Sequence, residues 1–267
     1  EYAAEVERGM KYLVSKQERN GFYAKRARSH EKMYAQAQAS IAICELYAMS
    51  KDSWLRPSAE LAVDFALKSQ SPEGGWRYEP GFDSDTSVTG WFVMALQSAR
   101  SAGLVENESE LREALERVDA FLDSVSSYEG AAYAYQARGN PSAPMTAEGI
   151  LCRQYISWPR DHPAMRRGID ALLVDDMFDI NRRDVYYWYY ATQVMHHYGG
   201  EPWKQWNGAM RVQLPKAQVR GNNEDGSWAP QSDRWGANSG RLFTTCLSIY
   251  CLEVYYRHMP LYQQQKN

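Results

Sequence analysis

Carboxylates at the start of apolar segments are the side chains of this sequence that could do chemistry. Asp83 and Asp85 stand directly before the apolar run that opens at Thr86. A carboxylate in such a place could act as a general acid if desolvation and neighbouring carboxylates keep it protonated. A second role is open to Asp85, because an aspartate in that place can accept a free N–H group of a helix and face the positive end of its dipole.

A row of aromatic and polar side chains forms a second candidate site. Tyr186, Tyr190, Gln193 and His197 recur at the spacing of one helical face. Such a row could line a cavity, where aromatic rings stabilise a cation or hold an isoprenoid or a sugar. The alternative is that these side chains simply fill the core. Further ligand candidates lie on other apolar segments: Trp91, Glu148, Arg153 and Arg241.

Metal ligation and the common motifs of nucleotide binding or nucleophilic catalysis have no support in the sequence. His196 and His197 are adjacent, and adjacent residues of a helix point about 100° apart, which makes a poor chelating pair. The four cysteines form no C-x-x-C pair and sit in apolar runs, as buried thiols do. No P-loop, Rossmann or G-x-S-x-G pattern occurs. We therefore expect no metal and no cofactor.

Charge and composition exclude several classes of partner. Lys plus Arg number 30 and Asp plus Glu 33, so the net charge of −3 gives no reason to expect nucleic acid or an anionic membrane. No segment reaches the roughly 18 apolar residues of a membrane span, and no signal peptide is visible. The chain begins at Glu1 rather than Met. We therefore expect a piece of a longer protein with other domains, whose compartment the sequence leaves unknown.

The chain repeats a pattern of roughly 50 residues five times. The first two copies, Tyr12–Tyr23 and Phe65–Trp76, read aromatic, small or aliphatic, three residues, Gln, three residues, Gly, one residue, aromatic. Phe121–Tyr133 is a fainter copy, Gln213–Trp228 is stretched by an insertion, and the copy at Ala171 keeps only the opening. The pattern predicts one domain of five repeats: residues 1–58, 59–109, 110–165, 166–206 and 207–262.

Each repeat pairs an amphipathic helix with a more apolar one. Before the Gln, apolar residues recur at helical spacing, as in residues 110–122. After the turn, the segments are apolar nearly all round, as in residues 86–96, and should be buried. No segment alternates with a period of two, so we predict an all-α protein of two concentric rings. The expected inner helices are Met33–Ser50, Asp85–Ala102, Met145–Ser157, Asp184–Tyr198 and Ser239–Arg257.

The Gln, Gly and aromatic residue of the repeat have a structural explanation. Gln at a helix end can donate to free carbonyls of the last turn or of a neighbouring repeat. Gly allows a positive φ where the chain turns back, and Trp packs between repeats. We therefore expect Trp76 and Trp228 to be buried rather than exposed in a site.

This repeat resembles the QW motif of the squalene–hopene cyclase, terpene cyclase and protein prenyltransferase β-subunit superfamily. In the first copy, Tyr23 stands where the motif has Trp. The segments Tyr186–Gln193 and Leu252–Tyr262 are also similar to bacterial squalene-cyclase-like or prenyltransferase-like repeat proteins. Over essentially the whole chain, the resemblance implies an α/α toroid that encloses an apolar cavity.

The catalytic motifs of that superfamily are incomplete in this chain. Its proton-initiated cyclases carry Asp-x-Asp-Asp before an inner helix, and the central Asp is the acid. The similar stretch here is Asp83-Ser84-Asp85, and if Asp85 takes the place of the motif's last Asp, Ser84 stands at the acid position. A shifted register places a carboxylate there but still leaves one carboxylate too few. The superfamily's zinc enzymes need an Asp-x-Cys pair, which does not occur here. The resemblance therefore implies the fold better than the activity.

Three functions remain open. The first is a toroid of unproven activity that binds an apolar, isoprenoid-like ligand or a partner in its central cavity. The second is an active terpene- or squalene-type cyclase that uses Asp83 or Asp85 as the acid. The third is a carbohydrate-active α/α toroid, which carboxylates at the cavity mouth would indicate: Asp83, Asp85, Glu148 and Asp184.

Overall fold

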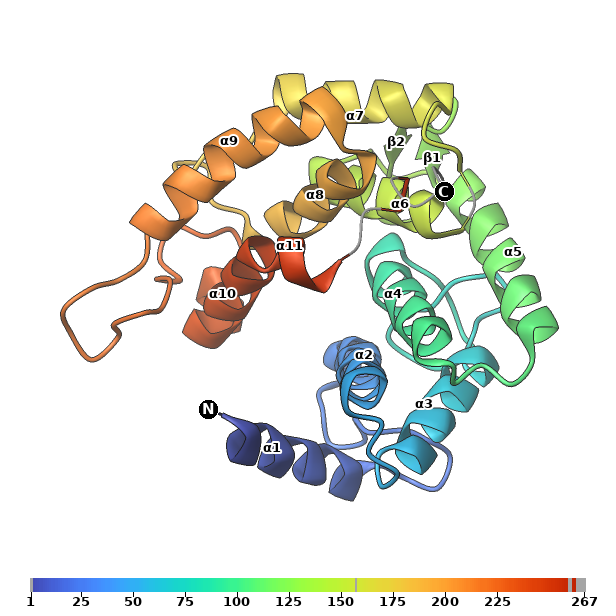
Figure 1. The fold of residues 1–267 in the computed structure, drawn as a ribbon. Coiled ribbons are helices and arrows are strands. Elements are labelled where there is room, and N and C mark those ends of the chain that lie inside the picture. Colours follow the sequence, from blue (N-terminus) through green and yellow to red (C-terminus); the bar gives the residue numbers. More distant parts are fainter. Residues whose placement is uncertain (1, 157, 259–260, 263–267) are drawn as a thin grey trace. The chain divides into compact units, whose positions relative to one another are not determined.

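The computed structural model describes residues 2–156, 158–258 and 261–262 (Figure 1). Ser157, the expected end of the third inner helix, and residues 259–260 of the fifth repeat lie outside the described residues. The described part is mostly helical, and its one sheet has two short strands, β1 (Ser126–Ser127) and β2 (Ala132–Tyr133). The all-α prediction is therefore confirmed.

The chain forms two compact bodies, which we describe separately. The N-terminal body comprises residues 1–125 and 135–139, and the C-terminal body comprises residues 126–134 and 140–267. None of the described helices has both the length and the apolar character that crossing a membrane would require. The division of the chain into five repeats within one domain stays a prediction.

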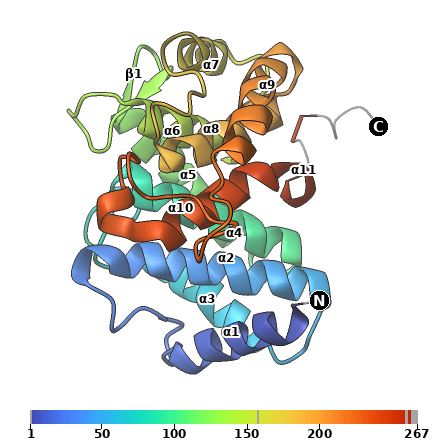
Figure 2. The same ribbon diagram turned by 90° about the vertical axis from the view of Figure 1, so that its left-hand side faces the viewer.

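In the N-terminal body, α2 packs along α4 and α3 contacts both (Figure 1). Figure 2 shows α1 and α3 on the same side of α2. Every residue of α4 from Thr86 to Leu96 is buried, as its apolar sequence predicts. The bounds are α1 Ala3–Lys16, the short 3-10 helix η1 Ser29–Glu31, α2 Lys32–Ser50, α3 Arg56–Lys68, α4 Thr86–Ala102 and α5 Glu108–Ser124.

In the C-terminal body, α8 packs along α6 and α10, while α7 and α9 lie outside them (Figure 1). The described inner helices begin and end within three residues of their predicted bounds except the fifth. There the predicted end at Arg257 is wrong, because α10 ends at Leu252 and a separate α11 follows it, and Gly240 interrupts α10 near its start with a φ of 75°. The bounds are α6 Ala143–Ile156, α7 Pro163–Asp175, α8 Val185–Tyr198, α9 Gly200–Lys216, α10 Gly236–Leu252 and α11 Val254–Arg257.

The repeat's Gln and Gly join neighbouring helices, as predicted. The amide of Gln70 donates to the carbonyl of Gly74 at 2.7 Å and to that of Ala114, in the next amphipathic helix, at 2.8 Å. Gly74 has a φ of +100°, and a Cβ there would lie 2.2 Å from the carbonyl oxygen of Arg117. The turn can therefore approach α5 only because position 74 has no side chain.

The repeat's tryptophans are buried, which confirms the expectation for both. Trp76 is 1% exposed, stacks on Phe92 at 4.9 Å, and donates its indole N–H to the carbonyl of Ala66. Trp228 is 5% exposed and donates to the carbonyl of Leu214. Each indole thus bonds to the last turns of the amphipathic helix that precedes it, which fixes the start of the following inner helix against its partner.

Candidate functional site

Asp85 is the N-cap of α4 and lies fully buried. Its Oδ1 accepts the backbone N–H of Val88 at 2.7 Å, and its own N–H donates to the carbonyl of Trp76 at 3.0 Å. A carboxylate in this place satisfies one of the free donors of the first turn and faces the positive end of the helix dipole. The capping interpretation of Asp85 is therefore confirmed.

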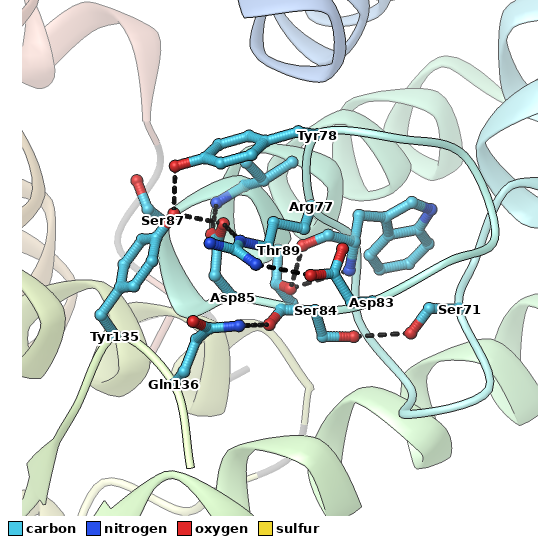
Figure 3. Close-up of polar contacts among 12 residues, drawn as sticks. Ser71, Arg77, Tyr78, Asp83, Ser84, Asp85, Ser87, Thr89, Tyr135 and Gln136 are labelled. Carbon is cyan, nitrogen blue, oxygen red and sulfur yellow. Dashed lines mark hydrogen bonds and ion pairs between the residues drawn. The ribbon is translucent and has the colours of Figure 1, made fainter. Parts of the chain in front are cut away.

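The second oxygen of Asp85 is the end of a chain of hydrogen bonds that runs through two tyrosines (Figure 3). Tyr135, 50 residues further along the chain, donates its hydroxyl to Oδ2 of Asp85 at 2.6 Å. The hydroxyls of Tyr135 and Tyr78 lie 2.6 Å apart. Since Tyr135 gives its only hydroxyl hydrogen to Asp85, Tyr78 is the donor in the second bond. The partly exposed Tyr78 is thus coupled to a fully buried carboxylate.

Arg77 links the two aspartates of the sequence motif (Figure 3). Its Nη1 lies 2.5 Å from Oδ2 of Asp83, and its Nε lies 3.4 Å from Oδ2 of Asp85. The guanidinium also lies over the ring of Tyr78, 4.7 Å from the centroid, and 5.8 Å from that of Tyr135. Aromatic faces attract a cation, so the two rings and the two carboxylates hold the guanidinium in one orientation.

Ser84, between the two aspartates, has a structural role. It is 2% exposed, and its hydroxyl accepts the backbone N–H of Gly75 at 2.9 Å and lies 2.7 Å from that of Ser71. Its own backbone N–H donates to Glu73 at 2.9 Å. The serine thus closes the turn that brings Arg77 to the start of α4, and it supplies no proton donor of a carboxylic acid's strength.

The two aspartates lie in different electrostatic environments. Burial raises the pKa of Asp85 to about 6, although the hydrogen bonds from Tyr135 and Val88 and the charge of Arg77 favour its charged form. Burial, followed by the nearby charge of Asp85, also raises the pKa of Tyr135, which therefore stays protonated. The side chain of Asp83 is 24% exposed. Asp83 is therefore the carboxylate that a ligand can contact, while Asp85 holds the surrounding groups in place.

In the C-terminal body, three of the predicted ligand-binding residues lie together. Tyr186 donates its hydroxyl to Oε2 of Glu148 at 3.0 Å, and the same hydroxyl lies 3.4 Å from that of Tyr190. Glu148 and Tyr190 are fully buried, whereas Tyr186 is partly exposed. The buried carboxylate of Glu148 thus accepts a hydrogen bond from a phenol hydroxyl beside two aromatic rings.

The other predicted ligand-binding residues have separate partners. Arg153 donates to the hydroxyl of Tyr133, His197 lies 3.2 Å from the hydroxyl of Tyr155, and Gln193 donates to the carbonyl of Tyr189. Burial lowers the pKa of His197, so this imidazole stays neutral near pH 7. Arg241 pairs with Glu224 at 2.8 Å. Trp91, on α4 of the N-terminal body, is buried. Their roles in binding stay predictions.

The sequence analysis did not identify Arg77, Tyr78 and Tyr135 as site residues. A local signal for two of them was present. Arg77 and Tyr78 directly follow Trp76, in the turn that leads to the start of α4, so their side chains could be expected near Asp85. Nothing local marks Tyr135, which reaches Asp85 through the next repeat's turn, where its carbonyl also accepts the N–H of Thr86. Within the described residues, no group of three or more His, Cys, Asp or Glu could hold a metal ion.

Comparison with known proteins gives a structural relative at low sequence identity. No family model matches the chain, and no curated protein matches it. Among solved structures, the chain is similar to an inactive variant of the α-1,6-mannanase GH76A of Salegentibacter sp. HEL1_6, in complex with α-1,6-mannotetrose. The identity is 10%, the TM-score is 0.59, and the match covers 94% of this chain and 97% of the mannanase. Two consecutive aspartates are replaced by alanine in that variant.

The comparison shows the fold and corrects the family. The chain has the all-α fold of α/α toroids, as predicted. The assignment to the squalene–hopene cyclase, terpene cyclase and prenyltransferase superfamily is wrong, because the similar structure is a mannanase. The resemblance rested on Gln, Gly and Trp, which join helices in this fold and carry no information about a ligand.

Proposed function

We propose that this chain is a carbohydrate-binding α/α toroid domain that holds a sugar at the start of α4. The observation that carries the proposal is the arrangement of Asp83, Arg77 and Tyr78. A partly exposed carboxylate lies on a guanidinium, and that guanidinium lies over an aromatic ring. Carboxylates and guanidinium groups bond to neighbouring hydroxyls, and aromatic rings pack on the apolar face of a sugar ring.

An isoprenoid ligand has no comparable support at this place. A hydrocarbon chain here would cover Asp83 and Arg77 without offering them a hydrogen bond, and desolvated charges are costly. A sugar would replace the lost water with its own hydroxyl groups. The similarity to a mannanase that is bound to a mannotetrose agrees with this choice of ligand.

Calorimetric titration with α-1,6-mannotetrose tests the proposal, with cellotetraose and maltotetraose as alternative glycans. We expect wild type to bind at least one of the three. Asp83→Ala should weaken that binding by about 10- to 100-fold, because hydrogen bonds to a charged group contribute about 1.5–3 kcal/mol. Asp64→Ala is the matched control, since Asp64 pairs with Lys68 on the exposed side of α3. No binding of any glycan, or equal binding by Asp83→Ala, would overturn the proposal.

Glycoside hydrolysis is the second candidate function. It needs a carboxylic acid that protonates the leaving oxygen and a carboxylate that acts as base or nucleophile. The raised pKa of Asp85 and the partial exposure of Asp83 favour such a division of roles. Because Asp85 is fully buried in this structure, it would have to become accessible to a substrate. Release of reducing ends from an α-1,6-mannan by wild type, lost in both Asp83→Asn and Asp85→Asn, would establish hydrolysis.

A further inference from the structure

The C-terminal body contains a second copy of the arrangement found at the start of α4. Asp184 is the N-cap of α8, and its Oδ1 accepts the N–H of Tyr187 at 3.0 Å. Its Oδ2 lies 3.7 Å from Nη1 of Arg234, whose guanidinium lies 5.5 Å from the ring centroid of Trp235. A buried capping aspartate, an arginine on its second oxygen and the aromatic residue that follows this arginine thus recur.

The two arrangements come from different parts of the repeat. Arg77 and Tyr78 precede Asp85 in the sequence, whereas Arg234 and Trp235 follow Asp184 by about 50 residues. In the second arrangement, Asp233 accepts the first N–H of α8, that of Val185, at 2.9 Å. This bond holds the segment of Arg234 and Trp235 against the start of α8. Helix capping alone would need neither the arginine nor the aromatic ring.

The second arrangement is more open than the first. Trp235 is 40% exposed, and the side chain of Arg234 is 60% exposed, compared with 25% for Arg77. The ring of Tyr186 lies 6.5 Å from that of Trp235, edge to face. The hydroxyl of Tyr186 in turn donates to the buried Glu148. An exposed indole therefore lies next to a guanidinium and next to a phenol that is anchored on a buried carboxylate.

We infer that Trp235, Arg234 and Tyr186 form a second carbohydrate subsite, in the C-terminal body, that binds sugar without Asp83. The inference rests on the proposed function. The indole supplies the platform for the apolar face of a sugar ring, and the guanidinium supplies hydrogen-bond donors for its hydroxyls. Asp184 and Asp233 position these two side chains through the start of α8 and do not contact the sugar.

Fluorine NMR on protein labelled with 5-fluorotryptophan tests the subsite, with α-1,6-mannotetrose as the probe. The resonance that is missing from Trp235→Phe identifies Trp235, and that missing from Trp54→Phe gives an exposed control in the N-terminal body. We expect the tetrose to shift the Trp235 resonance and leave that of Trp54 in place. The shift should persist in Asp83→Ala, and Arg234→Ala should raise the concentration needed for half of it at least 10-fold.

The outcomes separate this inference from the proposed function. If calorimetry detects tetrose binding that depends on Asp83 while the Trp235 resonance stays in place, the second subsite is refuted and the proposed function stands. A Trp235 shift that disappears in Asp83→Ala would also refute a separate subsite. If the tetrose neither binds by calorimetry nor shifts any resonance, it is a ligand of neither site, and the inference fails for the stated probe.

Discussion

The hydroxyl of Tyr135 lies 2.6 Å from Oδ2 of Asp85, across 50 residues of sequence. This bond ties the segment that contains Tyr135 to the buried cap of α4 within the N-terminal body. It also connects Asp85 to the partly exposed Tyr78, whose hydroxyl donates to Tyr135. The rings of both tyrosines also lie against the guanidinium of Arg77, which pairs with Asp83.

Replacing Tyr135 by Phe should destabilise the protein by about 1.5–3 kcal/mol, because a buried carboxylate loses a hydrogen-bond donor. The pKa of Asp85 should rise further, since the lost bond favours the charged form. Denaturant unfolding at pH 7 measures the first effect. Tyr12→Phe is the control, because Tyr12 is 61% exposed on α1. Equal stability of Tyr135→Phe and wild type would show that the bond contributes nothing.

Asp85 should make the protein less stable as the pH rises from about 4 to about 6. Its pKa is about 6 in the folded protein and about 3.9 in an unfolded chain, so the folded state binds more protons in this interval. Asp85→Asn keeps the cap and removes the titration. The free energy of unfolding of this variant, minus that of wild type, should therefore grow by about 2 kcal/mol between pH 4 and pH 7.

Unfolding curves of both proteins over that range measure this difference. Taking the difference cancels the contributions of other titrating groups, such as His197. A difference that stays constant with pH would mean that the pKa of Asp85 is not raised by folding.

Gly74→Ala should be much more destabilising than Gly81→Ala. Both glycines have a positive φ, which costs an alanine about 1–2 kcal/mol. Only at Gly74 would the added Cβ meet backbone, 2.2 Å from the carbonyl of Arg117, whereas nothing lies within 4 Å at Gly81. Thermal unfolding of the two variants separates the contact from the backbone strain. Equal melting temperatures would contradict the proposed close approach of the turn to α5.

Trp76→Ala should destabilise the protein by about 3–5 kcal/mol, as large aromatic deletions in cores do. The variant loses the stacking of the indole on Phe92 and the hydrogen bond from the indole N–H to the carbonyl of Ala66. The control is Trp54→Ala, since Trp54 is 37% exposed. A melting temperature unchanged by Trp76→Ala would refute the role of the tryptophan in joining the helices.

Local sequence patterns predicted much of this structure. They missed the contacts between residues that are far apart in the sequence. The apolar run after Asp85 predicted both α4 and its cap, because helix periodicity and capping depend on residues a few positions apart. The pairing of Asp85 with Tyr135 depends on how a turn of the next repeat is placed, and no local pattern encodes that. The family assignment failed because Gln70 and Trp76 join helices in this fold, whereas the ligand contacts that we propose involve Arg77 and Tyr78.

The central claim is that a sugar binds at the start of α4, and a crystal structure with α-1,6-mannotetrose tests it most directly. We predict sugar hydroxyls within hydrogen-bond distance of the Asp83 carboxylate, with a ring packed on Tyr78. The same soak of Asp83→Ala should leave this place without sugar. A tetrose that binds elsewhere only, or that is absent at concentrations at which calorimetry shows saturation, would contradict the claim.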